Sequence, residues 1–257
     1  SARAKMNHAL PSNLAEASRM FTTNLGAFKF DSIEAAQEKE KDMNDKNILL
    51  NELYKTGVVA VIRAEQSDTL IQTAEALIAG GVNFIEFTMT IPNAMEIIKE
   101  STQRLKDACF IGAGTVIDSE TARIAILAGA QYIVSPCYDE GLVRLCNSYS
   151  VPVMPGAYTP TEVLNAWKNG ADIVKIFPAD LGGPALFKDL KGPFPQIKIM
   201  PTGGVNFDTA AAFIKAGAYA IGVGGALADK KLIASGNFKQ ITENARRFVE
   251  IVEQARS

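Results

Sequence analysis

Lys175 stands inside the apolar run Asp172-Ile173-Val174-Lys175-Ile176-Phe177-Pro178, which predicts a buried strand that ends at a proline. Moving an ammonium group out of water is costly unless the group is paired or loses its proton. In a strand, Lys175 faces the same side as Ile173 and Phe177. Two interpretations are open: a lysine at a strand edge that reaches solvent, or a desolvated, nucleophilic amine that forms a Schiff base with a carbonyl.

A carboxylate interrupts a second apolar run, Phe84-Ile85-Glu86-Phe87-Thr88. If Ile85 and Phe87 meet outer helices, alternation turns Glu86 toward the interior, where a lone carboxylate is costly without a nearby cation. Glu86 is therefore either half of a structural ion pair with Lys175 or the general acid/base of the lysine's chemistry.

Two glycine pairs, Gly203-Gly204 and Gly224-Gly225, follow the apolar runs 197–201 and 219–223. Glycine allows the backbone N–H groups of a loop to approach a ligand closely. Either pair alone would be explained by a turn. In (β/α)8 barrels, however, the loops after the seventh and eighth strands commonly hold a phosphate, so the two pairs together predict a phosphate site.

The scaffold for these residues begins near Lys46, after which strands and helices alternate regularly to the end of the chain. Five of the predicted helices end in a glycine that precedes the next strand, at 57, 81, 129, 170 and 217. Strands are expected at 58–63, 83–88, 109–112, 131–134, 151–154, 172–176, 197–201 and 219–223, and helices at 47–55, 67–79, 92–105, 118–127, 139–148, 160–168, 183–190, 207–216 and 237–255.

Eight strand–helix units indicate an α/β fold with parallel strands, and eight is the number that closes a TIM (β/α)8 barrel. An open doubly wound sheet is the alternative, but no early GxGxxG motif follows the first strand. In a barrel, the carboxyl ends of the strands carry the chemistry. We therefore expect Lys175, Glu86 and the glycine pairs at one end of the fold.

Composition excludes several classes of function. The 257 residues carry a net charge of −2, which gives no basic field for nucleic acid or anionic membrane. No apolar run approaches the ~20 residues of a membrane helix. The only histidine, His8, lies outside the regular part, so histidine triads and histidine-rich metal sites are excluded there.

Three cysteines, Cys109, Cys137 and Cys146, form an odd set without a CxxC pair. This pattern predicts reduced thiols in a reducing compartment, and hence a cytoplasmic protein. Cys137 follows the fourth strand, where it could be reactive, but we expect a buried, inert thiol.

Residues 1–45 differ from the barrel domain expected at 46–257. The segment is basic up to Phe30 and dense in mixed charge afterwards, with a solvated helix expected at 31–42. It is interpreted as a surface appendage or as the remnant of a targeting segment. The second interpretation would place the protein in an organelle matrix instead of the cytoplasm.

The chain resembles the 2-keto-3-deoxy-6-phosphogluconate (KDPG) and 4-hydroxy-2-oxoglutarate aldolases over about residues 47–256. The resemblance rests on ordered motifs: Val59-Ala60-Val61-Ile62-Arg63, Ile85-Glu86-Phe87-Thr88, Ile111-Gly112-Ala113-Gly114-Thr115-Val116, Val134-Ser135-Pro136, Met154-Pro155-Gly156, Lys175-Ile176-Phe177-Pro178 and Pro201-Thr202-Gly203-Gly204-Val205.

The resemblance implies a class I aldolase, without metal or cofactor, that cleaves KDPG to pyruvate and glyceraldehyde 3-phosphate. It implies that Lys175 forms the Schiff base and that Glu86 is the general acid/base. The resemblance also implies substrate-binding residues. These are Arg63 and Thr115 for the pyruvate carboxylate, Thr202 for the substrate hydroxyls, Gly203, Gly204, Gly224 and Gly225 for the phosphate, and Pro136. A homotrimer is also implied.

Two departures from the family pattern matter for binding. Many relatives carry an arginine shortly after the glutamate, where this chain has Thr88-Met89-Thr90, so carboxylate binding would fall to Arg63. Some relatives place a serine at the position of Gly225. The alternatives are a galactonate-derived aldolase, an epimerase or another phosphosugar enzyme, or a non-catalytic scaffold whose extension docks to a partner.

Overall fold

The structure is a computed structural model that describes residues 46–63 and 67–257. The helix expected at 31–42 and the rest of the extension 1–45 lie outside the described residues. The division of the chain at residue 45 therefore stays a prediction.

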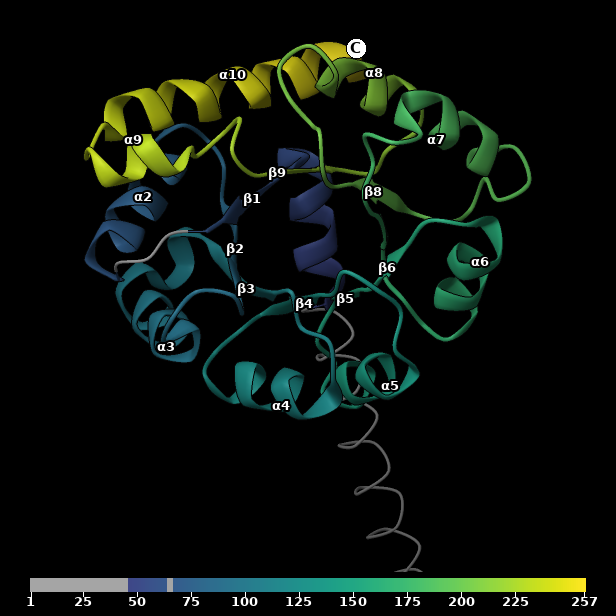
Figure 1. Ribbon diagram of the computed structural model, residues 1–257, viewed down its shortest axis with the longest axis horizontal. Coiled ribbons are helices and arrows are strands. Elements are labelled where there is room, and N and C mark those ends of the chain that lie inside the picture. The colour runs from purple at the N-terminus through teal and green to yellow at the C-terminus, as the bar shows by residue number, and fades with distance from the viewer. Residues whose placement is uncertain (1–45, 64–66) are drawn as a thin grey trace, which may run out of the picture. The chain divides into compact units, whose positions relative to one another are not determined.

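Parallel strands form the centre of the described part, in a six-stranded sheet of order β5-β4-β3-β2-β1-β9 and a three-stranded sheet of order β6-β7-β8. Both sheets curve around a common interior, and helices cover their outer side (Figure 1). The strands are β1 (Val58–Ile62), β2 (Phe84–Thr88), β3 (Phe110–Gly114), β4 (Tyr132–Val134), β5 (Val153–Met154), β6 (Gly156–Ala157), β7 (Val174–Ile176), β8 (Ile199–Pro201) and β9 (Ile221–Val223). The predicted α/β class with parallel strands is confirmed.

The strand expected at 151–154 is observed only at 153–154, as β5, and beyond Pro155 the chain continues as a second strand, β6, which the prediction missed. Proline has no N–H group for a ladder bond, but its carbonyl accepts from Lys175 N at 2.9 Å. The other sheet edges meet at an isolated parallel bridge between Thr202 and Gly222. The two sheets are thus adjacent at Pro155 and linked at this bridge.

The helices follow the predicted order, with bounds that mostly differ by one or two residues. A helix at 46–56 precedes β1. The prediction missed α9 and the 3-10 turn Lys106–Ala108, since elements of five and three residues have no measurable periodicity. The later helices are α2 (Ser67–Ala79), α3 (Ala94–Leu105), α4 (Ser119–Leu127), α5 (Glu140–Ser148), α6 (Pro160–Lys168), α7 (Gly183–Lys191), α8 (Ala210–Lys215), α9 (Lys230–Ala234) and α10 (Phe238–Arg256).

Local sequence signals explain where these helices begin and end. Thr159 and Glu162 form a reciprocal capping box at the start of α6, and the Asp118 side chain accepts from Thr121 N to cap α4. Gly129 and Gly170, with φ of 106° and 96°, adopt the left-handed conformation that follows a helix end. All five glycines predicted to end helices have positive φ.

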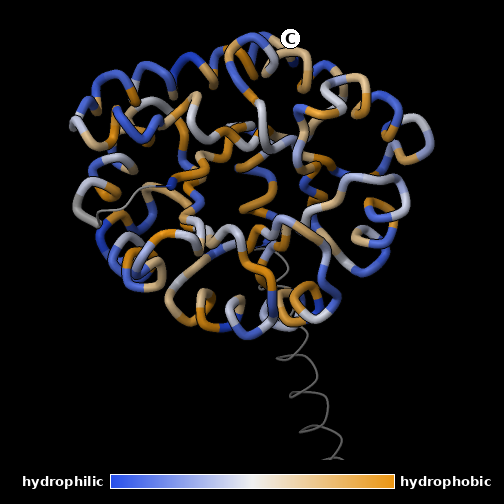
Figure 2. The backbone as a smooth tube through the Cα atoms, viewed as in Figure 1, coloured by the Kyte–Doolittle hydropathy of each residue, from blue (hydrophilic) through white to orange (hydrophobic). Residues whose placement is uncertain are grey.

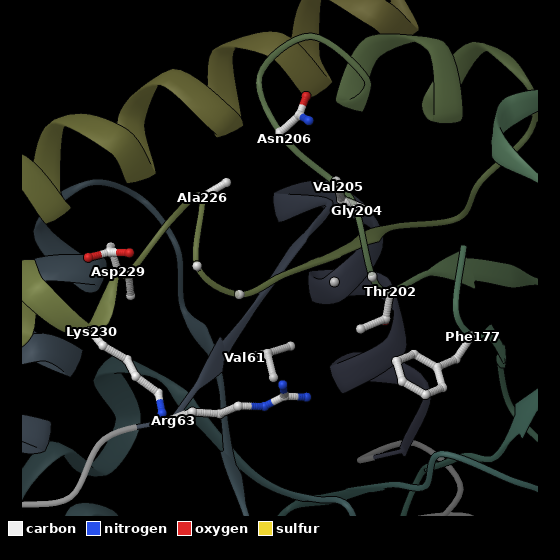
Figure 3. Close-up of a pocket in the computed structure, with 15 residues that line it drawn as sticks. Val61, Arg63, Phe177, Thr202, Gly204, Val205, Asn206, Ala226, Asp229 and Lys230 are labelled. Atoms are coloured by element: carbon white, nitrogen blue, oxygen red, sulfur yellow. The ribbon is translucent and has the colours of Figure 1, made fainter. Parts of the chain in front are cut away.

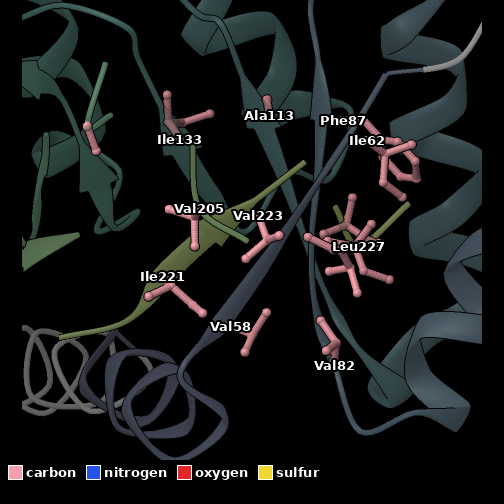
Figure 4. Close-up of a cluster of buried hydrophobic side chains, with 14 of the residues drawn as sticks. Val58, Ile62, Val82, Phe87, Ala113, Ile133, Val205, Ile221, Val223 and Leu227 are labelled. Carbon is pink, nitrogen blue, oxygen red and sulfur yellow. The ribbon is translucent and has the colours of Figure 1, made fainter. Parts of the chain in front are cut away.

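Two buried layers stabilise the described part. The outer layer packs one face of the strands against the helices, and Figure 4 shows Val58, Ile221 and Val223 in it. Hydropathy follows this arrangement, with hydrophobic residues on the strands and on the inner sides of helices (Figure 2). This burial is the main favourable contribution to folding.

The inner layer fills the space enclosed by the strands. Leu50 and Leu53 of the helix at 46–56 pack there with Phe84, Tyr132 and Ile173 from the strands. In Figure 1 this helix lies within the ring of strands, and several residues of the inner layer, such as Phe84, Tyr132 and Ile173, stand at or before the first residue of their strand. Among the described residues, no helix has the length and apolar character needed to cross a membrane.

Candidate active site

Lys175 lies in the middle of β7 and points to the interior. Its residue is only 3% exposed, and its Nζ lies 5.0 Å from the centre of the Phe177 ring. Ile173, two residues earlier, belongs to the inner layer, so the predicted alternation is confirmed. The interpretation of Lys175 as a lysine that reaches solvent is wrong, because the strand holds its side chain inside the fold.

Glu86 reaches the same interior from β2, and it is 1% exposed. A Cβ on Gly114 of the neighbouring β3 would collide with the Glu86 carboxylate, so the absence of a side chain there creates the space for it. Neither carboxylate oxygen has a hydrogen-bond partner within the described part of the chain. Both oxygens are therefore available to a ligand.

No direct ion pair joins Glu86 to Lys175 among residues 46–63 and 67–257, so the alternative of a structural salt bridge is wrong. The two groups still interact electrostatically. Burial raises the pKa of Glu86, against the opposing effect of Lys175 and Arg63. Burial lowers the pKa of Lys175, which Glu86 opposes and Arg63 reinforces. The environment favours a free amine beside a protonated carboxyl group.

A pocket of about 430 Å³ opens at the carboxyl ends of β1, β8 and β9 (Figure 3). Arg63, directly after β1, and Thr202, directly after β8, both line it. Thr202 is buried, and its hydroxyl has no partner in the described residues. The pocket thus joins a cation to an unpaired hydroxyl at the edge of the interior that holds Lys175.

All four predicted phosphate-site glycines line this pocket: Gly203, Gly204, Gly224 and Gly225. Gly203 and Gly204 have φ of 94° and 70°, a conformation that side chains disfavour. Within the described residues, the N–H groups of Gly203, Gly204 and Gly225 donate to no protein acceptor. Unused N–H groups that converge on a cationic pocket suit an anion.

Thr115 and Pro136 are not among the residues that line this pocket. Thr115 follows β3 in the left-handed conformation with φ of 58°, and both residues are half-buried. The structure thus places eight of the ten predicted residues in the interior or along the pocket. Of the other two, Thr115 directly follows Gly114, which adjoins Glu86, and the Pro136 carbonyl lies close to Gly156, the strand partner of Lys175.

The prediction of a buried Cys137 is wrong, because this thiol is exposed. Cys137 lies in the loop between β4 and α5 and not in a strand, so no neighbouring layer covers it. Cys109 and Cys146 are buried as expected, and burial raises the pKa of their thiols to about 11 and about 12.

The sequence reasoning missed Lys230, which begins α9 and lines the pocket, with its side chain running toward Arg63 (Figure 3). Asp229 caps α9 by accepting from Lys231 N at 2.8 Å. The Asp229-Lys230 pair five residues after Gly224-Gly225 resembles an ordinary surface turn, and only the capping aspartate could have indicated a helix start there.

Comparison with known proteins identifies the family. The model for KDPG and KHG aldolase matches residues 49–244. A 2-dehydro-3-deoxy-phosphogluconate aldolase of Treponema pallidum is 34% identical over 202 residues, which are 78% of this chain and 95% of that protein. The curated relatives are therefore matched over nearly their full length.

Solved structures agree with the sequence match. A structure described as native KDPGal superposes with a TM-score of 0.72 at 29% identity, covering 77% of this chain and 95% of that one. The KDPG aldolase of Legionella pneumophila, with pyruvate captured at low pH as a covalent carbinolamine intermediate, has a TM-score of 0.70 at 27% identity and covers 76% and 96% of the two chains. The chain belongs to the KDPG and KHG aldolase family.

Proposed function

We propose that this protein is a class I aldolase, a carbon–carbon lyase that cleaves KDPG to pyruvate and glyceraldehyde 3-phosphate. The single observation that carries the proposal is the buried Lys175 amine, whose pKa burial lowers, in the same interior as the unpaired Glu86 carboxyl group. A free amine at neutral pH is the form that attacks a carbonyl.

In the proposed reaction, the Lys175 amine attacks C2 of the substrate and forms a carbinolamine, which loses water to give an iminium ion. The protonated Glu86 first donates its proton to the hydroxyl group that leaves the carbinolamine as water. The resulting Glu86 carboxylate then accepts the C4 hydroxyl proton as the C3–C4 bond breaks, and the bond electrons move into the iminium to give an enamine. Protonation of the enamine and hydrolysis then release pyruvate and the free amine. C4 becomes the carbonyl carbon of the released glyceraldehyde 3-phosphate.

The remaining site residues are proposed to bind the two ends of the substrate. Arg63 binds the carboxylate, together with Thr115 and Pro136, and Thr202 contacts the hydroxyls. The pocket glycines and Lys230 bind the phosphate, since unused N–H groups and a cation converge there. Lys230 supplies charge at a site where Gly225 offers no hydroxyl.

The protein is also proposed to cleave 4-hydroxy-2-oxoglutarate, which needs the same lysine but no phosphate pocket. The pocket at the carboxyl ends of β8 and β9 favours the phosphorylated substrate.

The adjacency of the sheets at Pro155 and the bridge between Thr202 and Gly222 support a closed eight-stranded barrel. We also propose that the protein is a homotrimer, which sedimentation would test. Its proposed location is the cytoplasm or an organelle matrix, and cell fractionation would distinguish the two.

The test of this function is the release of pyruvate from KDPG by the purified protein, followed with a coupled dehydrogenase. Lys175→Ala should abolish release, and Glu86→Gln should lower kcat by about 10²-fold or more, as the loss of a general acid/base does. Full activity of Glu86→Gln would exclude its role. No pyruvate release by the unaltered protein would exclude the proposed substrate.

A further inference from the structure

A second pocket, of about 380 Å³, lies at the opposite ends of two strands that carry the phosphate pocket. Lys198 directly precedes β8, and Tyr219 lies two residues before β9. Both residues line the second pocket, whereas Thr202 and Gly224 follow the same strands and line the first. We call the second one the amino-end pocket.

Three cations line the amino-end pocket, Lys191, Lys198 and Arg256, and no acidic residue is among its lining residues. Within the described part of the chain, none of the three forms an ion pair. The chain as a whole has a net charge of −2, so this concentration of uncompensated positive charge is local. Such a cluster attracts anions.

The cations are held in place by neutral groups. Lys191 Nζ donates to the carbonyls of Pro195 and Ile197 at 2.7 and 2.9 Å. Arg256 donates to the carbonyls of Tyr54 and Tyr219. These bonds fix the geometry without neutralising charge, and they leave one ammonium N–H of Lys191 and several guanidinium N–H groups of Arg256 for a ligand.

Aromatic rings complete the wall of the pocket. The ring centres of Tyr54 and Tyr219 lie 5.0 Å apart. Arg256 Cζ lies 4.2 Å from the centre of the Tyr54 ring, and Lys198 Nζ lies 5.1 Å from the centre of the Tyr219 ring. Each ring therefore already faces a cation, which leaves little ring surface for a base or other aromatic ligand. The ligand class that fits is a compact, multiply charged anion.

The pocket also desolvates its charges. Burial lowers the pKa of Lys191, and it lowers the pKa of Arg256 against the opposing effect of Tyr54 and Tyr219, so no acidic group offsets the desolvation of either cation. At Gly217, where φ is 97°, a Cβ would lie 3.2 Å from Lys191 Cγ, so the glycine keeps the lysine stem close to the wall. A bound anion would supply the missing compensation.

We infer that the amino-end pocket is a second anion site, separate from the aldolase site, which binds a small phosphate-bearing molecule or free polyphosphate through Lys191, Lys198 and Arg256. A single pocket with three cations is too small for a nucleic-acid footprint, which takes a basic patch or stripe. The inference does not depend on the proposed catalytic function, because the two pockets share no lining residue.

The test is an NMR titration of the protein with inorganic pyrophosphate, and in a second arm with glycerol 3-phosphate. The Lys230→Gln variant serves as background, because Lys230 lines the phosphate pocket and does not line the amino-end pocket. We expect the backbone signals of Lys198, Tyr219 and Arg256 to shift with increasing ligand. If only pyrophosphate shifts them, the ligand is a free polyphosphate, and if both do, the site also accepts phosphate esters.

Lys198→Gln in that background should weaken the apparent affinity about fivefold or more, because it removes one of the three cations of the pocket. The fold should be retained, since Lys198 Nζ forms no ion pair within the described residues and only faces the Tyr219 ring. Lys168→Gln is the matched control, because Lys168 is exposed on α6 and lines neither pocket. Absence of any shift at Lys198 and Tyr219, or equal affinities for Lys198→Gln and Lys168→Gln, would overturn the inference.

Discussion

The amine of Lys175 and the carboxyl group of Glu86 share an environment that favours the neutral form of each. Burial is the largest cause of both shifts, and mutual attraction opposes it. The pKa of Glu86 is raised and the pKa of Lys175 is lowered, so burial prevails over attraction. The residue-level chemistry therefore depends on how deeply these two side chains are buried and on the nearby charge of Arg63.

Arg63→Gln should shift the pH dependence of imine formation to higher pH. Arg63 helps to lower the pKa of Lys175, so removing its charge raises that pKa and the free amine then appears at higher pH. The measurement is the rate of imine formation with saturating pyruvate across a pH series. Arg144→Gln, an exposed arginine paired with Glu140 on α5, is the control and should leave the profile in place. A shift to lower pH would contradict the assigned electrostatics.

Lys230→Gln should raise KM for KDPG about three- to tenfold with little change in kcat, because it removes one charge from phosphate binding. KM for 4-hydroxy-2-oxoglutarate, which has no phosphate, should stay the same. Lys231→Gln is the neighbouring control, since Lys231 is exposed and does not line the pocket. An equal rise in KM for the two substrates would show that Lys230 does not bind the phosphate.

At the scale of elements, neighbouring strands position Glu86 by leaving room for it. A Cβ on Gly114 of β3 would occupy the place of the carboxylate. Gly114→Ala should therefore turn Glu86 away and lower kcat about hundredfold, toward the effect of Glu86→Gln. The unfolding temperature should fall by a few degrees at most, because the side chain can rotate to relieve the collision.

The control for this change is Gly192→Ala, at the end of α7, where the new Cβ would make only ordinary contacts at 3.5 Å or more. Its kcat should equal that of the unaltered protein. A Gly114→Ala protein with unchanged kcat would show that the carboxylate position is not limiting.

The sequence was most informative where local signals and periodicity agree. The strand of Lys175 and the five helix-ending glycines were predictable, because alternation and left-handed φ are local properties. The break at Pro155 was visible as a proline, but its division of a strand between two sheets depends on long-range pairing. The exposure of Cys137 depends on which layers cover a loop, which spacing does not encode.

The candidate site was predictable to the extent that its residues stand at strand ends. Lys175, Glu86 and the pocket glycines were found in this way. Lys230 was missed, since it comes from a five-residue helix after the last strand. The absence of a direct ion pair between Lys175 and Glu86 is a matter of distance, and sequence gives no distance between residues far apart in the chain.

At the scale of the whole molecule, both buried layers and all the proposed site residues lie within 46–257. A protein that begins at Lys46 should therefore turn over KDPG within about twofold of the rate of the full chain, because a compact domain with its own core can fold by itself. Lys46 itself is retained because it pairs with Asp172 at 2.9 Å. A loss of turnover by tenfold or more would give residues 1–45 a role in the site.

The role of Lys175 as the nucleophile can be tested by a pyruvate–borohydride trap. The protein is incubated with pyruvate, reduced with borohydride, digested and mapped by mass spectrometry, with Lys175→Ala treated in parallel. We expect a reduced pyruvate adduct on the peptide that contains Lys175 and none in the Lys175→Ala protein. An unmodified Lys175 peptide, or equal labelling of the Lys175→Ala protein, would contradict it.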